Sequence, residues 1–220
     1  MVEIYDDHEQ SERVRDWIKE NGSAVVMGIV LAISGLYGWK FWQNAEQDSQ
    51  AQVAAEFQNL TLTLDDERFD QAFTHFETIR AEYPKSAYLP MSQLMIARAR
   101  LQQGQPDLAE TIYRDILGAK AKSTEFIQFI AAERLARLLL HNGDSAAAEV
   151  ILDKYDNNEA FASRFSEVRG DLLATRGDAD GAREAYQKAL DSMESGTGDR
   201  RMLELKRDNP VSIAAVTEDS

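Results

Sequence analysis

The sequence contains no cysteine, and this absence excludes disulfide bonds, thiolate zinc sites and cysteine nucleophiles. Other signatures of enzyme chemistry are missing as well. The three histidines, His8, His75 and His141, lie far apart in the sequence, and none has a second ligand at the spacing of a metal site. No glycine-rich phosphate loop follows a strand pattern, and no serine lies in a nucleophile-elbow sequence. We therefore expect no catalytic residues, no metal site and no cofactor.

Basic residues are scarce. The chain has 24 lysines and arginines against 38 aspartates and glutamates, which gives a net charge of −14, and residues 43–220 alone carry −11. An acidic domain is a poor candidate for nucleic-acid binding, because that function requires a basic surface. Anionic lipid headgroups would repel the same charge. We expect the domain to bind no nucleic acid and to stand off the bilayer.

Charged residues are absent from one long stretch, between Glu20 and Lys40. Residues 23–42 are mainly apolar, and a helix of about 20 residues is about 30 Å long, which matches the hydrocarbon core of a bilayer. The run ends in aromatic side chains, among them Trp39 and Trp42, which suit the headgroup level. The pattern predicts a transmembrane helix, since buried helices of soluble proteins are usually amphipathic.

A cleaved signal peptide is the alternative, but it would have a shorter apolar region after a short basic start. Here 22 residues with seven acidic side chains come first. Basic residues then predict the orientation: Arg13, Arg15 and Lys19 precede the apolar run, and Lys40 follows it. The positive-inside rule places residues 1–22 in the cytoplasm and delivers the remainder across the membrane, into the periplasm of a bacterium.

Small residues recur along the predicted transmembrane helix at spacings of four, four and three. They are Ala24, Gly28, Ala32 and Gly35. A face of small residues allows a second helix to approach closely. Glycine and alanine are also common in membrane spans, so the pattern indicates either a helix-pairing face or composition alone.

The rest of the chain shows a repeat of about 34 residues. Glycine suits the left-handed position that stops a first helix, and Asp144 or Asp178 can cap the second helix that follows. The turn glycines are Gly104, Gly143 and Gly177, and a degenerate earlier copy lacks this glycine. This is the tetratricopeptide pattern. It predicts an all-α fold in which a single N-terminal transmembrane helix precedes a tetratricopeptide-like α-solenoid of helix pairs.

The boundaries of the parts follow from these patterns. We expect a cytoplasmic segment at 1–22, a transmembrane helix at 23–42, a periplasmic tetratricopeptide-like domain at 43–208 and a disordered tail at 209–220. Neither glycine nor proline occurs in residues 43–55, so we expect the transmembrane helix to continue outward into the domain without a flexible linker.

Repeat scaffolds bind through the concave surface formed by their first helices. The register predicts a client groove formed by Leu94, Arg98, Leu101, Glu133, Arg137 and Leu140, followed by Glu167 and Asp171 in the next repeat. Arg98 and Arg137 are unusual in an acidic domain and can clamp a carboxylate or a backbone carbonyl of an extended client. The alternative is that these arginines pair with Glu133 or Glu167 on neighbouring helices.

Several short motifs carry a resemblance to a known family. The sequences E-I-Y at 3–5, E-N-G at 20–22 and G-W-K-F-W at 38–42 resemble those of the YfgM family, as do R-L-A-R at 134–137 and G-D-x-x-G-A-R at 177–183. Members of this family are ancillary subunits of the SecYEG translocon with a periplasmic tetratricopeptide-like domain. The resemblance implies the SecYEG translocon and a periplasmic chaperone as partners, emerging secreted or envelope proteins as clients, and the bacterial inner membrane as the location.

Two classes of function remain open at this point. The first is an interaction protein of the translocon that binds chaperones or emerging chains. The second is a scaffold or regulatory protein of the cell envelope that signals through its cytoplasmic segment, where Val14, Trp17 and Ile18 form a short apolar helix face. The proteins that co-migrate with the chain from membranes distinguish the two.

Overall fold

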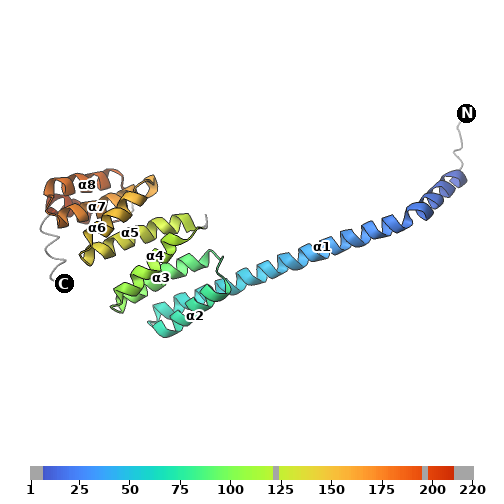
Figure 1. Cartoon of the computed structure of the whole chain (residues 1–220), viewed down its shortest axis with the longest axis horizontal. Helices are drawn as coiled ribbons and strands as arrows, with labels where there is room; N and C mark the ends of the chain where they lie inside the picture. The colour runs from blue at the N-terminus through green and yellow to red at the C-terminus, as the bar shows by residue number, and fades with distance from the viewer. Residues whose placement is uncertain (1–6, 121–123, 195–197, 211–220) are drawn as a thin grey trace, which may run out of the picture. The chain divides into compact units, whose positions relative to one another are not determined.

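The computed structural model describes residues 7–120, 124–194 and 198–210, and these residues form α-helices joined by short turns, with no strand among them (Figure 1). The predicted all-α fold is thus confirmed. The chain divides into two compact units, Met1–Gln52 and Val53–Ser220.

Helix α1 (Asp7–Asp65) contributes to both units. In the part of the chain that the structure describes, α1 alone contains a stretch long and apolar enough to cross a membrane, judged by length and composition, and none of that stretch is buried against protein. Its large apolar side chains, such as Leu36 and Phe41, are exposed. In a helix every backbone amide of such a stretch is satisfied internally, which is the condition that lipid imposes.

The second unit is a succession of helix pairs (Figure 1). The end of α1 packs against α2 (Phe69–Glu82), where Val53 and Leu60 share a core with Ile79. The later helices are α3 (Tyr88–Gln102) with α4 (Pro106–Gly118), α5 (Glu125–His141) with α6 (Ser145–Tyr155), α7 (Ala162–Thr175) with α8 (Ala179–Asp191), and α9 (Arg200–Asp208), with a short 3-10 turn η2 (Glu159–Phe161) before α7. The arrangement is the predicted stack of repeats, in which each pair packs on its neighbours.

The turns inside the pairs follow the predicted chemistry. The glycines at the turns, Gly104, Gly143 and Gly177, all have φ between 70° and 80°. The first repeat, which lacks the glycine, places Glu67 in the same left-handed region at φ 57°. The carboxylates of Asp144 and Asp178 each accept a backbone hydrogen bond from the following helix, at 2.9 Å and 3.0 Å. The predicted helix stops and caps are therefore present.

Helices α7 and α8 pack closely against each other. Gly170 lies against the ring of Tyr186, and a β-carbon added at this glycine would overlap that ring. Ala182, on the same helix as Tyr186, is fully buried. Tyr186 therefore fills space within its own helix pair, over Gly170.

Candidate functional site

The structure separates the predicted groove residues by exposure. Leu94 of α3 and Glu133 of α5 are buried, and Leu140 is half-buried against the core. Arg98 and Leu101 of α3 are exposed. Only some of the residues predicted to form the client groove are therefore accessible to a ligand.

A pocket of about 490 Å³ lies where α3, α4 and α5 meet. Its lining contains three of the predicted groove residues, Arg98, Leu101 and Arg137, and adds Tyr113, Arg134, Leu138 and His141. The sequence held a signal for two of the added residues. Arg134 and His141 lie three residues before and four residues after Arg137, so they share its face of α5.

Arg137 is held by acidic groups on its own helix and on the next first helix. Its Nε bonds to Glu133, its second guanidinium nitrogen lies 3.1 Å from Glu167 Oε2, and a third contact of 3.3 Å reaches Asp171 Oδ2. Pairing with Glu133 and Glu167 was the alternative interpretation of this arginine. The structure shows that pairing and adds Asp171.

Lys206 of α9 extends the same network from the other end of the repeats. Its Nζ lies 2.8 Å from Glu167 Oε1 and 2.8 Å from Asp171 Oδ1. The Tyr186 hydroxyl also donates to Asp171 Oδ1, at 2.9 Å. We call the five charged residues of this network the charge ladder: Glu133, Arg137, Glu167, Asp171 and Lys206.

The charge ladder shifts the pKa values of two of its members, Arg137 and Glu167. Burial disfavours the charge on Arg137, but the carboxylates of Glu133, Glu167 and Asp171 outweigh it and raise the pKa of the guanidinium. Burial likewise opposes ionisation of Glu167, yet Arg137 and Lys206 outweigh that cost and lower the pKa of this carboxyl. Both shifts favour the charged forms of Arg137 and Glu167 near neutral pH.

Two further arginines of the pocket differ from Arg137. Within the described residues, neither Arg98 nor Arg134 forms an ion pair with a carboxylate. Arg134 lies beside Tyr113, and burial raises the pKa of that tyrosine hydroxyl despite the nearby positive charge. The pocket therefore presents positive charge that the ladder does not neutralise, in a chain of net charge −14.

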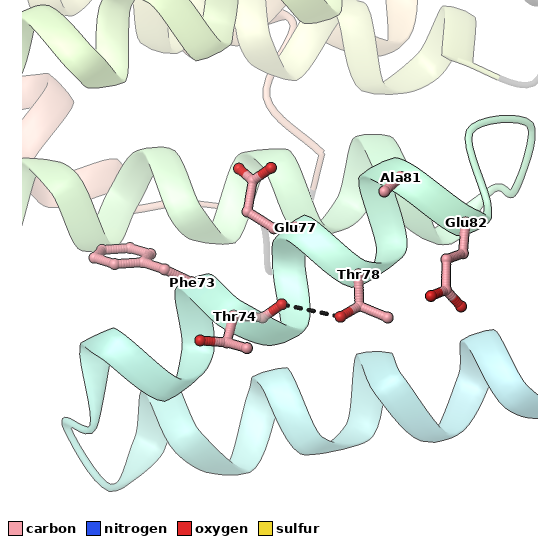
Figure 2. A pocket seen from close by; sticks show the side chains of 6 residues that line it. All are labelled: Phe73, Thr74, Glu77, Thr78, Ala81 and Glu82. Carbon is pink, nitrogen blue, oxygen red and sulfur yellow. Dashed lines mark hydrogen bonds between the residues drawn. The ribbon is translucent and has the colours of Figure 1, made fainter.

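A second depression, also of about 490 Å³, lies on α2. Figure 2 shows that its lining side chains all come from this one helix: Phe73, Thr74, Glu77, Thr78, Ala81 and Glu82. The hydroxyl of Thr78 donates to the backbone carbonyl of Thr74 at 3.2 Å, and the guanidinium of Arg100 lies 3.6 Å from the Phe73 ring centroid. Because all of its lining residues come from one helix, this depression is the weaker candidate.

The small residues of the predicted helix-pairing face are exposed on α1. They are Ala24, Gly28, Ala32 and Gly35. A β-carbon built at Gly28 or Gly35 would contact nothing within 4 Å. The face is accessible, and its pairing with another helix stays a prediction.

Histidines and acidic residues do not gather into a group that could hold a metal ion in the described ranges. The Nδ1 of His75 lies 2.7 Å from Glu56 Oε2. His141 lines the pocket where α3, α4 and α5 meet, which we call the α5 pocket.

The tetratricopeptide repeat-like domain family matches residues 15–211 of the chain. An ancillary SecYEG translocon subunit of Escherichia coli (strain K12) is 27% identical over 196 residues, which cover 87% of this chain and 91% of that protein. Proteins of the same name from Haemophilus influenzae and Neisseria gonorrhoeae are each 24% identical, over 95% of this chain and 100% and 99% of their own lengths. The resemblance to the YfgM family is thereby confirmed, and the chain belongs to the tetratricopeptide repeat-like domain family.

Proposed function

We propose that the chain is an ancillary subunit of the bacterial Sec translocon. The observation that carries this proposal is that relatives named ancillary SecYEG translocon subunit align with most of the chain. The family match at residues 15–211 includes the apolar part of α1. Residues 23–42 anchor the protein in the inner membrane. The basic residues Arg13, Arg15 and Lys19 support a cytoplasmic N-terminus and hence a periplasmic domain at 43–208.

The anchor meets the channel through its small-residue face. Between helices in lipid there is little hydrophobic driving force, so close packing of small residues contributes much of the association. The exposed line of Ala24, Gly28, Ala32 and Gly35 on α1 supports this role.

The helical repeats bind periplasmic chaperones or emerging secreted and envelope proteins. Support comes from the repeat architecture, whose first helices form an extended binding surface, and from the pocket lined by Arg98, Leu101 and Arg137 on that surface. The role requires no chemistry beyond reversible binding.

The proposal is tested by gentle solubilisation of membranes and purification of the tagged full chain. We expect SecY, SecE and SecG to be enriched over a purification from cells that express an unrelated tagged single-pass protein at equal abundance. Recovery of wall or outer-membrane assembly factors without the channel would instead support the envelope scaffold that signals through residues 1–22.

A further inference from the structure

The α5 pocket is lined by one arginine that is paired with carboxylates and by two that are not. Arg137 already contacts three carboxylates through Glu133, Glu167 and Asp171. Arg98 on α3 and Arg134 on α5 line the same pocket, and neither has a carboxylate partner among the described residues. The positive charge available to a ligand is therefore concentrated on Arg98 and Arg134.

Arg98 and Arg134 contrast with arginines elsewhere in the domain. Many other arginines of the domain are paired, for example Arg114 with Glu110 at 2.8 Å and Arg176 with Glu149 at 2.7 Å. Like charges that face one pocket repel each other unless an anion lies between them. An incoming carboxylate would remove that repulsion and would accept forked, charge-assisted hydrogen bonds from a guanidinium.

The apolar part of the pocket indicates what carries this carboxylate. Leu101 is 38% exposed and Leu138 lines the same pocket, so an apolar side chain next to the carboxylate would be partly covered. A volume of about 490 Å³ accommodates a few side chains of an extended segment. Acidic and apolar side chains at adjacent positions are a property of a polypeptide.

We propose that the α5 pocket binds an extended protein segment through an aspartate or glutamate side chain, which Arg98 and Arg134 hold while a neighbouring apolar side chain packs on Leu101 and Leu138. This inference rests on the proposed role of the repeats in binding protein segments, and it specifies the chemistry of the segment. Arg137 contributes positioning, since the charge ladder fixes it at the edge of the pocket.

The test uses the full chain in phosphatidylcholine nanodiscs and a fluorescein-labelled, acetylated and amidated peptide with two glutamates between two leucines. A matched peptide has glutamine in place of both glutamates. We expect fluorescence anisotropy to show at least about tenfold tighter binding of the glutamate peptide, since each charge-assisted bond contributes about that factor. Equal affinity for the two peptides would overturn the proposal.

Variants of the chain test whether Arg98 and Arg134 are responsible for the tighter binding of the glutamate peptide. Arg98→Gln and Arg134→Gln should each weaken binding of the glutamate peptide about tenfold, while Arg114→Gln, which removes an exposed arginine of α4 away from the pocket, should leave it unchanged. Arg98 is exposed and has no carboxylate partner in the described part of the chain, so its replacement tests the pocket even if Arg134→Gln disturbs the packing around Tyr113. Equal affinities of Arg98→Gln and Arg114→Gln would overturn the assignment.

Purification of SecYEG with the same variants separates this inference from the proposed function. Loss of peptide binding by Arg98→Gln with normal recovery of the channel supports both the pocket and the translocon role. A wild-type chain that binds the glutamate peptide but recovers no channel subunits would contradict the translocon role and leave the pocket assignment in place.

Discussion

Arg137 and Lys206 bind the same two carboxylates, although one lies on α5 and the other on α9. Glu167 gives Oε2 to Arg137 and Oε1 to Lys206, and Asp171 gives Oδ2 to Arg137 and Oδ1 to Lys206. Each oxygen pair is thus divided between two cations. The ladder connects three helices that are not consecutive in the chain, α5, α7 and α9.

Removal of the central cation should destabilise the domain. In Arg137→Met, Glu133 stays buried without its partner, and we expect the free energy of unfolding to fall by about 1–3 kcal/mol, the cost of an unsatisfied buried acceptor. Arg98→Met is the matched control, because this exposed arginine has no carboxylate partner among the residues that the structure describes and should change stability by less than about 0.5 kcal/mol. Urea unfolding followed by circular dichroism measures both. Equal midpoints would show that the ladder contributes nothing to stability.

The lowered pKa of Glu167 predicts a dependence of stability on pH. A carboxyl whose pKa is lower in the folded state stabilises the protein above its unfolded pKa, about 4.5, and this contribution is lost as pH falls through the folded pKa. We therefore expect the stability difference between wild type and Glu167→Gln to shrink as pH is lowered from 7 to below 4. Glu184→Gln, on the exposed face of α8, is the control and should show a smaller difference. A constant difference across this range would contradict the shift.

The contact between α7 and α8 leaves no room at Ala182, which is fully buried. Ala182→Leu should overpack it and lower the free energy of unfolding by about 1–3 kcal/mol. Ala146→Leu, the same change at an exposed position of α6, should be close to neutral. The measurement is the urea midpoint of each variant, and an unchanged midpoint for Ala182→Leu would disprove close packing at this position.

Orientation in the membrane is testable because the chain has no cysteine of its own. Single variants Gln10→Cys and Asn157→Cys, treated in intact cells with a thiol reagent that does not cross the inner membrane, should label at position 157 and not at position 10. Asn157 is exposed, so access within the domain is not limiting. The reverse labelling pattern would place the domain in the cytoplasm.

The helix-pairing face is tested by one bulky substitution. Gly28→Leu keeps α1 apolar and long enough to insert, but it holds a partner helix away from the small-residue face. We expect normal membrane insertion and weaker recovery of the SecYEG subunits. Ile29→Leu, one position further along the helix, should recover them as the wild type does. If both variants recover equal amounts, the small residues reflect composition and association occurs elsewhere.

Periodicity predicted most of the fold because each repeat is a local unit. Gly143 and Gly177 mark turns whose chemistry depends on a few neighbouring residues, and Asp144 caps the helix that follows its own turn. The first repeat shows the limit of this approach. Its turn adopts the same left-handed geometry at Glu67, where a side chain costs about 1–2 kcal/mol and no sequence motif indicates the conformation.

The sequence predicted which residues of the first helices form the candidate site, but it did not predict every ion pair among them. Repeat spacing placed Arg137 near Glu167, which lies 30 residues later on the next first helix, because neighbouring first helices stack in register. Lys206 lies beyond the last glycine-marked turn, in a short polar helix, and its approach to Glu167 depends on how α9 folds back onto α7. That geometry is a property of tertiary packing and leaves no local pattern.

We expect helix α9 to be among the first parts of the solenoid to open. It has nine residues and one fully buried apolar side chain, Leu203, so little burial opposes its fraying. When α9 detaches, Lys206 leaves Glu167 and Asp171, and Arg137 alone remains to neutralise them. Backbone amides of α9 should then exchange with solvent by local opening, whereas those of α5, surrounded by core on both sides, exchange only when the whole domain unfolds.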